Sequence, residues 1–241
     1  MTTATEPAST EQTFTDQTFS EPTFTDQAWR DSAALRSSID ELPFLLRLAD
    51  GTLDAGTFSG YLAQDALYLG DYARVLAAAA SQCTDPDELM FWANSAYGAI
   101  AVERQLHETR VAPLDATEPT VAEMMPVCRA YTSYLWALVG QGCYPVLAAA
   151  ILPCFWIYDD VGSRLKNAVA DLAGHPYSDW IATYGDPDFA ESTRQARVIV
   201  DTLAQQSSPE VTARMYQAFR TSCRYEWMFW DAPSRDEAWP S

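Results

Sequence analysis

The chain has 241 residues, and its 33 acidic side chains outnumber the 15 basic ones, which gives a formal net charge of −18. A chain of this length can bury a core without the help of disulfides or a structural metal. Binding to nucleic acid or to an anionic membrane needs a basic surface, so the excess of carboxylates excludes both as expected partners.

The first 27 residues differ in composition from the rest of the chain. Residues 1–27 contain five carboxylates and no basic residue, and the sequence TFTDQ occurs twice, at 13–17 and 23–27. Isolated phenylalanines among polar residues cannot form a core, so this segment is predicted to be a disordered acidic tail. Docking of the repeated motif to a partner is the alternative. The helical domain is expected to span 28–241.

From Ala28 onward, apolar residues recur at helical spacing, and the alternating pattern of strands is scarce. The first helix is predicted over 31–49, ending where Gly51 offers a left-handed C-terminal cap. Asp54 can cap a long second helix that ends before Pro86. Further helices are predicted over 87–110, 120–139, 144–172 and 178–183, and two more follow Pro187 and Pro209. We therefore predict an all-α, single-domain bundle of seven or eight helices.

The five cysteines and two histidines limit the possible chemistry. The cysteines are scattered, which indicates free thiols in a cytoplasmic protein rather than disulfides or zinc ligands. No signal-peptide pattern opens the sequence. His107 follows Glu103 by four residues, which favours a hydrogen-bonded pair over a metal site, and His175 is predicted to be an exposed loop residue. Two histidines are too few for di-iron motifs and disfavour a Ser-His-Asp triad, so no metal or cofactor is predicted.

The predicted second helix carries one carboxylate among tyrosines. Tyr61, Asp65, Tyr68 and Tyr72 follow at i, i+4, i+7 and i+11, which places them on one side of the helix. Such a set can bind a flat, amino-bearing ring by stacking and by charge-assisted hydrogen bonds. Tyrosines at this spacing are also common as core residues, and both interpretations stay open.

Two later segments carry candidate reactive groups. Cys154 and Tyr158 share a helix face in PCFWIY, where a thiolate would be a nucleophile if a base lay nearby. A buried, unreactive cysteine is the alternative. Glu226 lies in the aromatic run YEWMFW, where burial would raise its pKa and let it donate a proton near neutral pH. Its alternative is a surface glutamate paired with Arg220 or Arg224.

Four segments, taken in order, resemble the signature of the TenA family, the thiaminase II or aminopyrimidine aminohydrolase proteins. The first segment begins with DGTL and continues through the tyrosine-rich helix, and the second contains LPCFWIY. The third contains Trp180, Tyr184 and Phe189, and the fourth ends in FWD. They lie at residues 50–74, 152–162, 180–189 and 226–231, and the similarity covers about residues 40–232.

The resemblance implies a haem-oxygenase-like helical fold, a homotetramer, and a site without haem or metal. It implies that Cys154, of the family's cysteine-containing class, is the nucleophile and that Glu226 is the acid/base. By the same match, Asp65 binds the amino group and ring nitrogen of a pyrimidine. The matching pocket tyrosines are Tyr68, Tyr131, Tyr158 and Tyr184.

The implied activity is hydrolysis in thiamin salvage, in which an aminomethylpyrimidine gives hydroxymethylpyrimidine and ammonia. Thiamine would give the same pyrimidine and the thiazole. The alternative is a pyrimidine or thiamin binder, or a regulatory protein, without catalytic activity. An oxygenase of the same fold superfamily is a third possibility, which would require a cluster of His and Glu ligands.

Overall fold

The computed structural model describes residues 21–106, 123–235 and 237–240. All of the regular structure in these residues is helical, which confirms the predicted all-α class. The helices are α1 (Phe24–Asp31), α2 (Ala33–Asp40), α3 (Pro43–Asp50), α4 (Ala55–Gln82), α5 (Pro86–Leu106), α6 (Pro126–Gln141), α7 (Tyr144–Ala168), α8 (Ser178–Tyr184), α9 (Pro187–Gln206), α10 (Pro209–Asp231) and a short 3-10 helix, η2 (Ala232–Arg235).

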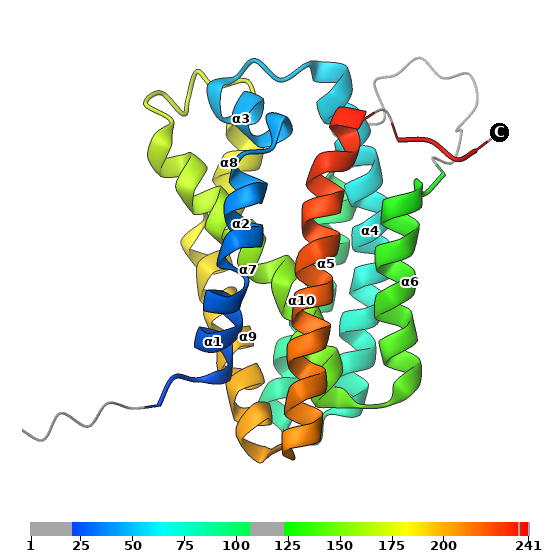
Figure 1. Cartoon of the computed structure of the whole chain (residues 1–241). Helices are drawn as coiled ribbons and strands as arrows, with labels where there is room; N and C mark the ends of the chain where they lie inside the picture. The colour runs from blue at the N-terminus through cyan, green and yellow to red at the C-terminus, as the bar shows by residue number, and fades with distance from the viewer. Residues whose placement is uncertain (1–20, 107–122, 236, 241) are drawn as a thin grey trace, which may run out of the picture.

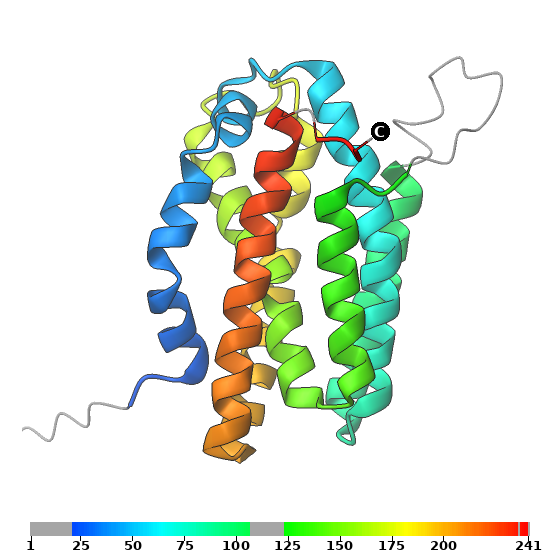
Figure 2. The same ribbon diagram turned by 45° about the vertical axis from the view of Figure 1, so that its right-hand side comes forward.

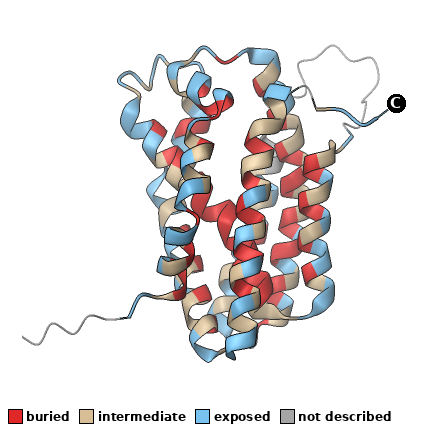
Figure 3. Cartoon of the chain, in the orientation of Figure 1, coloured by how far each residue is buried: buried red, intermediate tan, exposed pale blue. Residues whose placement is uncertain are grey.

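The helix α7 is the centre of the molecule. It crosses the bundle obliquely, with α4, α5, α6 and α10 to one side and α1, α2 and α9 to the other (Figures 1 and 2). Every residue from 146 to 158 is buried, and α7 packs most extensively against α10 and α9, which also carry buried residues (Figure 3). By length and composition α7 could cross a membrane, but 83% of its most apolar stretch is buried by the other helices. A helix that is apolar all round and enclosed in this way is a core helix.

The ends of α3 and α4 follow the predicted capping residues. Gly51 has φ 76°, the left-handed conformation that closes α3. The Asp54 carboxylate accepts a 2.9 Å hydrogen bond from the Thr57 amide and caps α4. These short-range signals therefore set the start of the long helix that carries Asp65.

The N-terminal predictions were wrong in two respects. The tail was predicted to extend to residue 27, but α1 begins at Phe24, where a capping box on Thr23 starts the helix. The single helix predicted over 31–49 consists of α2 and α3, because Pro43 lacks an amide hydrogen and keeps Leu42 extended. Residues 1–20 lie outside the described residues, so the rest of the tail stays a prediction.

The remaining boundaries shift by a few residues. The fourth predicted helix starts at Pro126 rather than 120, and the fifth ends at Ala168 rather than 172. The short helix after residue 178 is confirmed as α8. The helix predicted over 87–110 is α5, Pro86–Leu106, and residues 107–110 lie outside the described residues.

Candidate active site

A cavity of about 530 Å³ lies between α4, α5, α7, α8 and α9. Its inner wall contains five side chains with polar groups, namely Asp65, Tyr72, Cys154, Tyr158 and Tyr184. The wall on the solvent side comes from α5 and α9, where Met90, Asn94 and Gln195 are exposed. A concave, largely apolar cavity with a few convergent polar groups is typical of small-molecule sites.

Cys154 lies in the buried part of α7, directly after Pro153, whose ring removes one backbone hydrogen bond of the helix. Burial raises the pKa of the Cys154 thiol well above its usual range, and the nearby charge of Glu226 raises it further. The neighbouring Tyr68 and Tyr72 side chains act in the opposite direction. In the unliganded protein this group is therefore a thiol at neutral pH, and it needs a proton acceptor to become a nucleophile.

Asp65 is buried on α4, with only 2% of its surface exposed. Burial raises the pKa of Asp65 to about 7, although Tyr158 and Tyr184 lower it. The Tyr158 hydroxyl donates a 3.4 Å hydrogen bond to Oδ1, whereas Oδ2 has no hydrogen-bond partner among the described residues. A protonated carboxyl group offers one donor and one acceptor, the complement of an amino group beside a ring nitrogen.

Glu226 is 1% exposed, so the alternative of a surface glutamate paired with Arg220 or Arg224 is wrong. Burial raises the pKa of Glu226 to about 8, and the Tyr131 hydroxyl lowers it by donating a 2.7 Å hydrogen bond to Oε1. Glu226 is therefore mostly protonated at neutral pH and can act as an acid. Glu226, Tyr68 and Tyr131 lie behind the cavity wall rather than on it.

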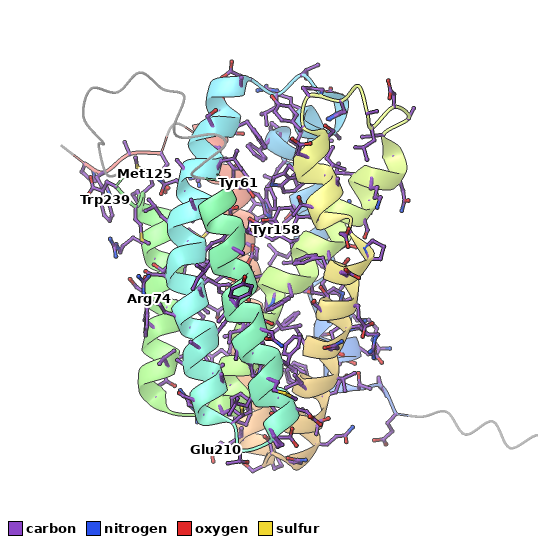
Figure 4. The ribbon with its side chains drawn as sticks, turned by 180° about the vertical axis from the view of Figure 1, so that it is seen from behind. Tyr61, Arg74, Met125, Tyr158, Glu210 and Trp239 are labelled. Carbon is purple, nitrogen blue, oxygen red and sulfur yellow. The ribbon has the colours of Figure 1, made fainter. Side chains whose placement is uncertain are left out.

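The tyrosines connect these groups through rings and hydroxyls. The rings of Tyr68 and Tyr131 pack at 5.0 Å, and those of Tyr158 and Tyr184 pack at 4.8 Å. The Tyr61 hydroxyl lies 3.0 Å from that of Tyr158, and the two side chains meet in the interior from α4 and α7 (Figure 4). Because Tyr158 donates to Asp65, the arrangement lets Tyr61 donate to Tyr158, which aims the Tyr158 hydroxyl at the carboxylate.

The structure brings all seven predicted residues into one region, although they come from four predicted helices and the short helix α8. Sequence reasoning missed the wall from α5, whose Phe91, Asn94 and Ser95 have no motif that marks them as ligand contacts. It placed Tyr72 in the aromatic set without a role, and the Tyr72 hydroxyl proves to lie beside the thiol. The one signal in the sequence was that Tyr72 follows Asp65 by seven residues and therefore lies on the same side of α4.

His175, the one histidine among the described residues, is not part of the cavity wall. His175 is half-buried rather than exposed, since its Nδ1 accepts a 3.2 Å hydrogen bond from the Tyr177 amide. The predicted Glu103–His107 pair lies outside the residues whose side chains are described. Within the described part of the chain, no three His, Cys, Asp or Glu side chains are grouped as metal ligands.

A second cavity, of about 590 Å³, lies between the N-terminal turns of α4 and α6 and the end of α10. Core residues Tyr61 and Phe229 form part of its wall. Its carboxylates already have structural partners: Asp54 caps α4, and Glu237 accepts a hydrogen bond from the Val127 amide. The cavity with Cys154 and Asp65 combines a buried nucleophile candidate with a carboxyl group of raised pKa, so it is the candidate active site.

Solved structures identify the class to which this fold belongs. A domain of unknown function with a heme oxygenase-like fold from Shewanella denitrificans OS217 superimposes with a TM-score of 0.68 at 14% identity. That match covers 87% of this chain and 91% of the other. A TenA homologue from Pyrococcus horikoshii OT3 superimposes with a TM-score of 0.77 at 28% identity, over 88% of this chain and 99% of the other. The molecule is therefore a helical bundle of the haem-oxygenase-like class.

The sequence comparisons identify the family within that class. The model of the TENA/THI-4/PQQC family matches residues 35–237. An aminopyrimidine aminohydrolase of Bacillus subtilis is 34% identical over 200 residues, which covers 82% of this chain and 84% of that protein. The chain belongs to the TENA/THI-4/PQQC family.

Proposed function

We propose that the protein is an aminopyrimidine aminohydrolase of thiamin salvage, with Cys154 as nucleophile and Glu226 as acid/base. The observation that carries this proposal is the single cavity in which the Cys154 thiol and the Asp65 carboxyl group face the same space, with Glu226 directly behind them. The names of relatives such as the B. subtilis aminohydrolase support the substrate class.

The substrate would bind with its amino group and ring nitrogen against Asp65, beside the rings of Tyr158 and Tyr184 on the cavity wall. A carboxyl group with a pKa near 7 can supply a donor to the ring nitrogen and an acceptor to the amino group at the same time. The partner-free Oδ2 of Asp65 is available for this contact. The exposed α5 and α9 wall gives the substrate and the released ammonia a route to solvent.

The reaction would then proceed by covalent catalysis. The Cys154 sulfur adds to a ring carbon while the thiol proton passes, by way of Asp65, to the ring nitrogen. Glu226 gives its proton to the exocyclic amine, which leaves as ammonia with the electron pair of its bond to the methylene. Water adds to the methylene and returns a proton to Glu226. The sulfur–carbon bond breaks, its electron pair returns to sulfur, and the ring nitrogen gives the proton back.

The test is ammonia release from 4-amino-5-aminomethyl-2-methylpyrimidine by wild type, Cys154→Ser and Cys223→Ser. Cys223 is a matched control because it is fully buried on α10 and is not part of the cavity wall. We expect Cys154→Ser to lose at least about 10³-fold in kcat and Cys223→Ser to keep most of it. Full activity of Cys154→Ser would contradict the nucleophile assignment.

The same assay separates the enzyme from the binder. A wild-type protein that binds hydroxymethylpyrimidine in calorimetry but releases no ammonia would be a pyrimidine-binding protein. Replacing the aminopyrimidine by thiamine tests thiaminase activity, because both substrates present the same ring and differ in the leaving group.

We also propose that the protein is a cytoplasmic homo-oligomer, a tetramer by family resemblance. The helix α5 packs mainly against α4, and the observation in support is its outer face, where Leu89, Tyr97 and Ile100 are exposed. An exposed apolar helix face is typical of an interface. Light scattering of wild type and Tyr97→Asp tests this, and a monomeric wild type would refute it.

A further inference from the structure

The short helix α8 brings Tyr184 to the cavity, and it packs chiefly against α7. Trp180 and Ile181 are its buried residues, and Tyr184 is its last residue. The Tyr184 ring packs against those of Tyr158, at 4.8 Å, and Phe189, at 5.5 Å. The position of Tyr184 in the site therefore depends on how the end of α8 is held.

Gly162 lies on α7, one turn after Tyr158, at the point where the end of α8 touches α7. A Cβ atom at position 162 would lie 2.5 Å from the carbonyl oxygen of Tyr184 and 2.6 Å from its Cβ atom. Real Cβ atoms essentially never come closer than 3.0 Å to another heavy atom. The obstructing atoms are backbone and Cβ rather than the end of a flexible side chain, so any other residue would displace Tyr184 itself.

A reciprocal contact forms one turn further along α7. The Lys166 ammonium group donates a 2.8 Å hydrogen bond to the carbonyl oxygen of Gly185, the residue that ends α8. A Cβ atom at position 185 would in turn lie 2.8 Å from Cδ of Lys166. A cation at this position satisfies a terminal carbonyl and opposes the negative end of the helix dipole.

We propose that Gly162 and Lys166 are positioning residues that seat the end of α8 and so place Tyr184 in the active site. Neither residue is part of the cavity wall, so both act through Tyr184. This inference rests on the proposed function, in which Tyr184 contacts the substrate. The seat itself consists of a close backbone approach at Gly162 and of the bond from Lys166 to Gly185.

The first test is amide hydrogen exchange of residues 178–185 in Gly162→Ala, with Gly140→Ala as control. Gly140 is also a helical glycine, but a Cβ atom there meets no heavy atom within 4 Å. We expect exchange of the α8 segment to rise at least about tenfold in Gly162→Ala and to stay at the wild-type rate in Gly140→Ala. Equal exchange rates in the two variants would contradict the proposal that Gly162 holds the end of α8 in place. This result would not depend on which reaction the protein catalyses.

The second test is kinetic. With the aminopyrimidine as substrate, we expect Gly162→Ala to lose about 10- to 100-fold in kcat/KM, since a displacement near 1 Å has effects of this size. In a Tyr184→Phe background, Gly162→Ala should lower kcat/KM much less, because part of its effect is exerted through the Tyr184 side chain. Full additivity would show that Gly162 does not act through Tyr184.

Lys166 provides a variant that keeps the close helix approach intact. Lys166→Met retains the aliphatic stem that packs on Gly185 but removes the donor, and we expect a loss of kcat/KM of about 2- to 10-fold. Lys166→Arg should restore most of it, which a general loss of packing would not predict. A wild type that releases no ammonia would refute the proposed function, whereas the exchange experiment would still decide the seat.

Discussion

Asp65 and Glu226 are the two carboxyl groups that the bundle encloses most completely in its site. Their raised pKa values, about 7 and about 8, are maintained by burial. As the pH rises above the ordinary range of a carboxyl group, the unfolded chain ionises both groups while the native protein keeps them protonated. Their contribution to stability is therefore present in acid and is lost as the pH rises through 7 and 8.

We expect Asp65→Asn to raise the free energy of unfolding by about 1–3 kcal/mol at pH 8 and by less at pH 5. Asparagine cannot ionise in the unfolded chain, so the variant avoids the proton uptake that costs stability in the wild type. Urea denaturation at the two pH values measures the difference. The control is Glu41→Gln, an exposed carboxylate at the end of α2, which should not show this pH dependence. A gain that is equal at both pH values would contradict the linkage.

The hydrogen bond from Tyr131 to Glu226 gives a second prediction at this scale. Tyr131→Phe removes the donor that favours the ionised carboxylate, so the pKa of Glu226 should rise above about 8. Because the proposed acid works in its protonated form, the fall of kcat/KM at alkaline pH should move to higher pH. A pH–rate profile of Tyr131→Phe and of the distant Tyr216→Phe measures this shift. An unchanged alkaline limb would argue against Glu226 as the acid.

Sequence reasoning predicted these residues unevenly, and the physical reasons differ. The helical spacing from Tyr61 to Tyr72 placed Asp65 on a defined side of α4, and all four side chains are buried. The environment of Glu226 could not be predicted, because an aromatic run on one helix does not reveal which helices cover it. Tyr131 carries no local signal, and only the resemblance indicated it.

At the scale of the elements, α1 is joined to α9 by a buried contact that no sequence pattern indicated. Thr25 is fully buried, and its amide and hydroxyl donate hydrogen bonds of 2.8 and 2.9 Å to the Asp201 carboxylate. The stacked rings of Trp29 and Trp156, 4.0 Å apart, add a second contact between α1 and α7. Residues 24–27 therefore belong to the folded domain and not to the tail.

We expect Thr25→Val to lower the free energy of unfolding by about 1–3 kcal/mol, because one oxygen of Asp201 loses its buried donor. Thr202→Val is the matched control, since the Thr202 hydroxyl donates to the Val198 carbonyl oxygen of its own helix and not to another helix among the described residues. Denaturation of both variants at neutral pH gives the comparison. Equal stabilities would mean that the contact between α1 and α9 is energetically unimportant.

Elements that begin or end at a local signal were predicted well. Asp54 caps α4 and Gly51 closes α3 because a carboxylate beside free amides and a residue without Cβ act within one turn. The break at Pro43 was missed, although proline carries the same kind of local information. The seat of α8 at Gly162 depends on two segments more than twenty residues apart, and spacing alone could not reveal it.

At the scale of the whole molecule, the formal net charge of −18 determines how the protein responds to salt. Like charges repel more strongly in the compact state than in the unfolded chain, and added salt screens them. We expect the free energy of unfolding to increase by about 1 kcal/mol between 0.05 and 0.5 M NaCl, or roughly 2–4 °C in Tm. The increase should shrink near pH 5, where carboxylates begin to protonate. A salt effect that is the same at both pH values would refute this explanation.

The cavity belongs to the same scale. Its wall is assembled from five helices, and two of them, α5 and α9, contribute no residue that was predicted to belong to the site. Helical periodicity indicates which side of each helix is buried, but it does not indicate which helices are neighbours. The bundle could therefore be predicted from one sequence, whereas the shape of its cavity could not.

Lys166, the single lysine of the chain, lies at the α8 seat, and its side chain is exposed. Apart from the N-terminal amine, it is the one primary amine that common acylating reagents can modify. Acetylation or dye labelling would remove the charge that binds Gly185 and would thus change the position of Tyr184. Coupling of this protein to amine-reactive beads or fluorophores should impair it far more than the modification of one surface residue usually does.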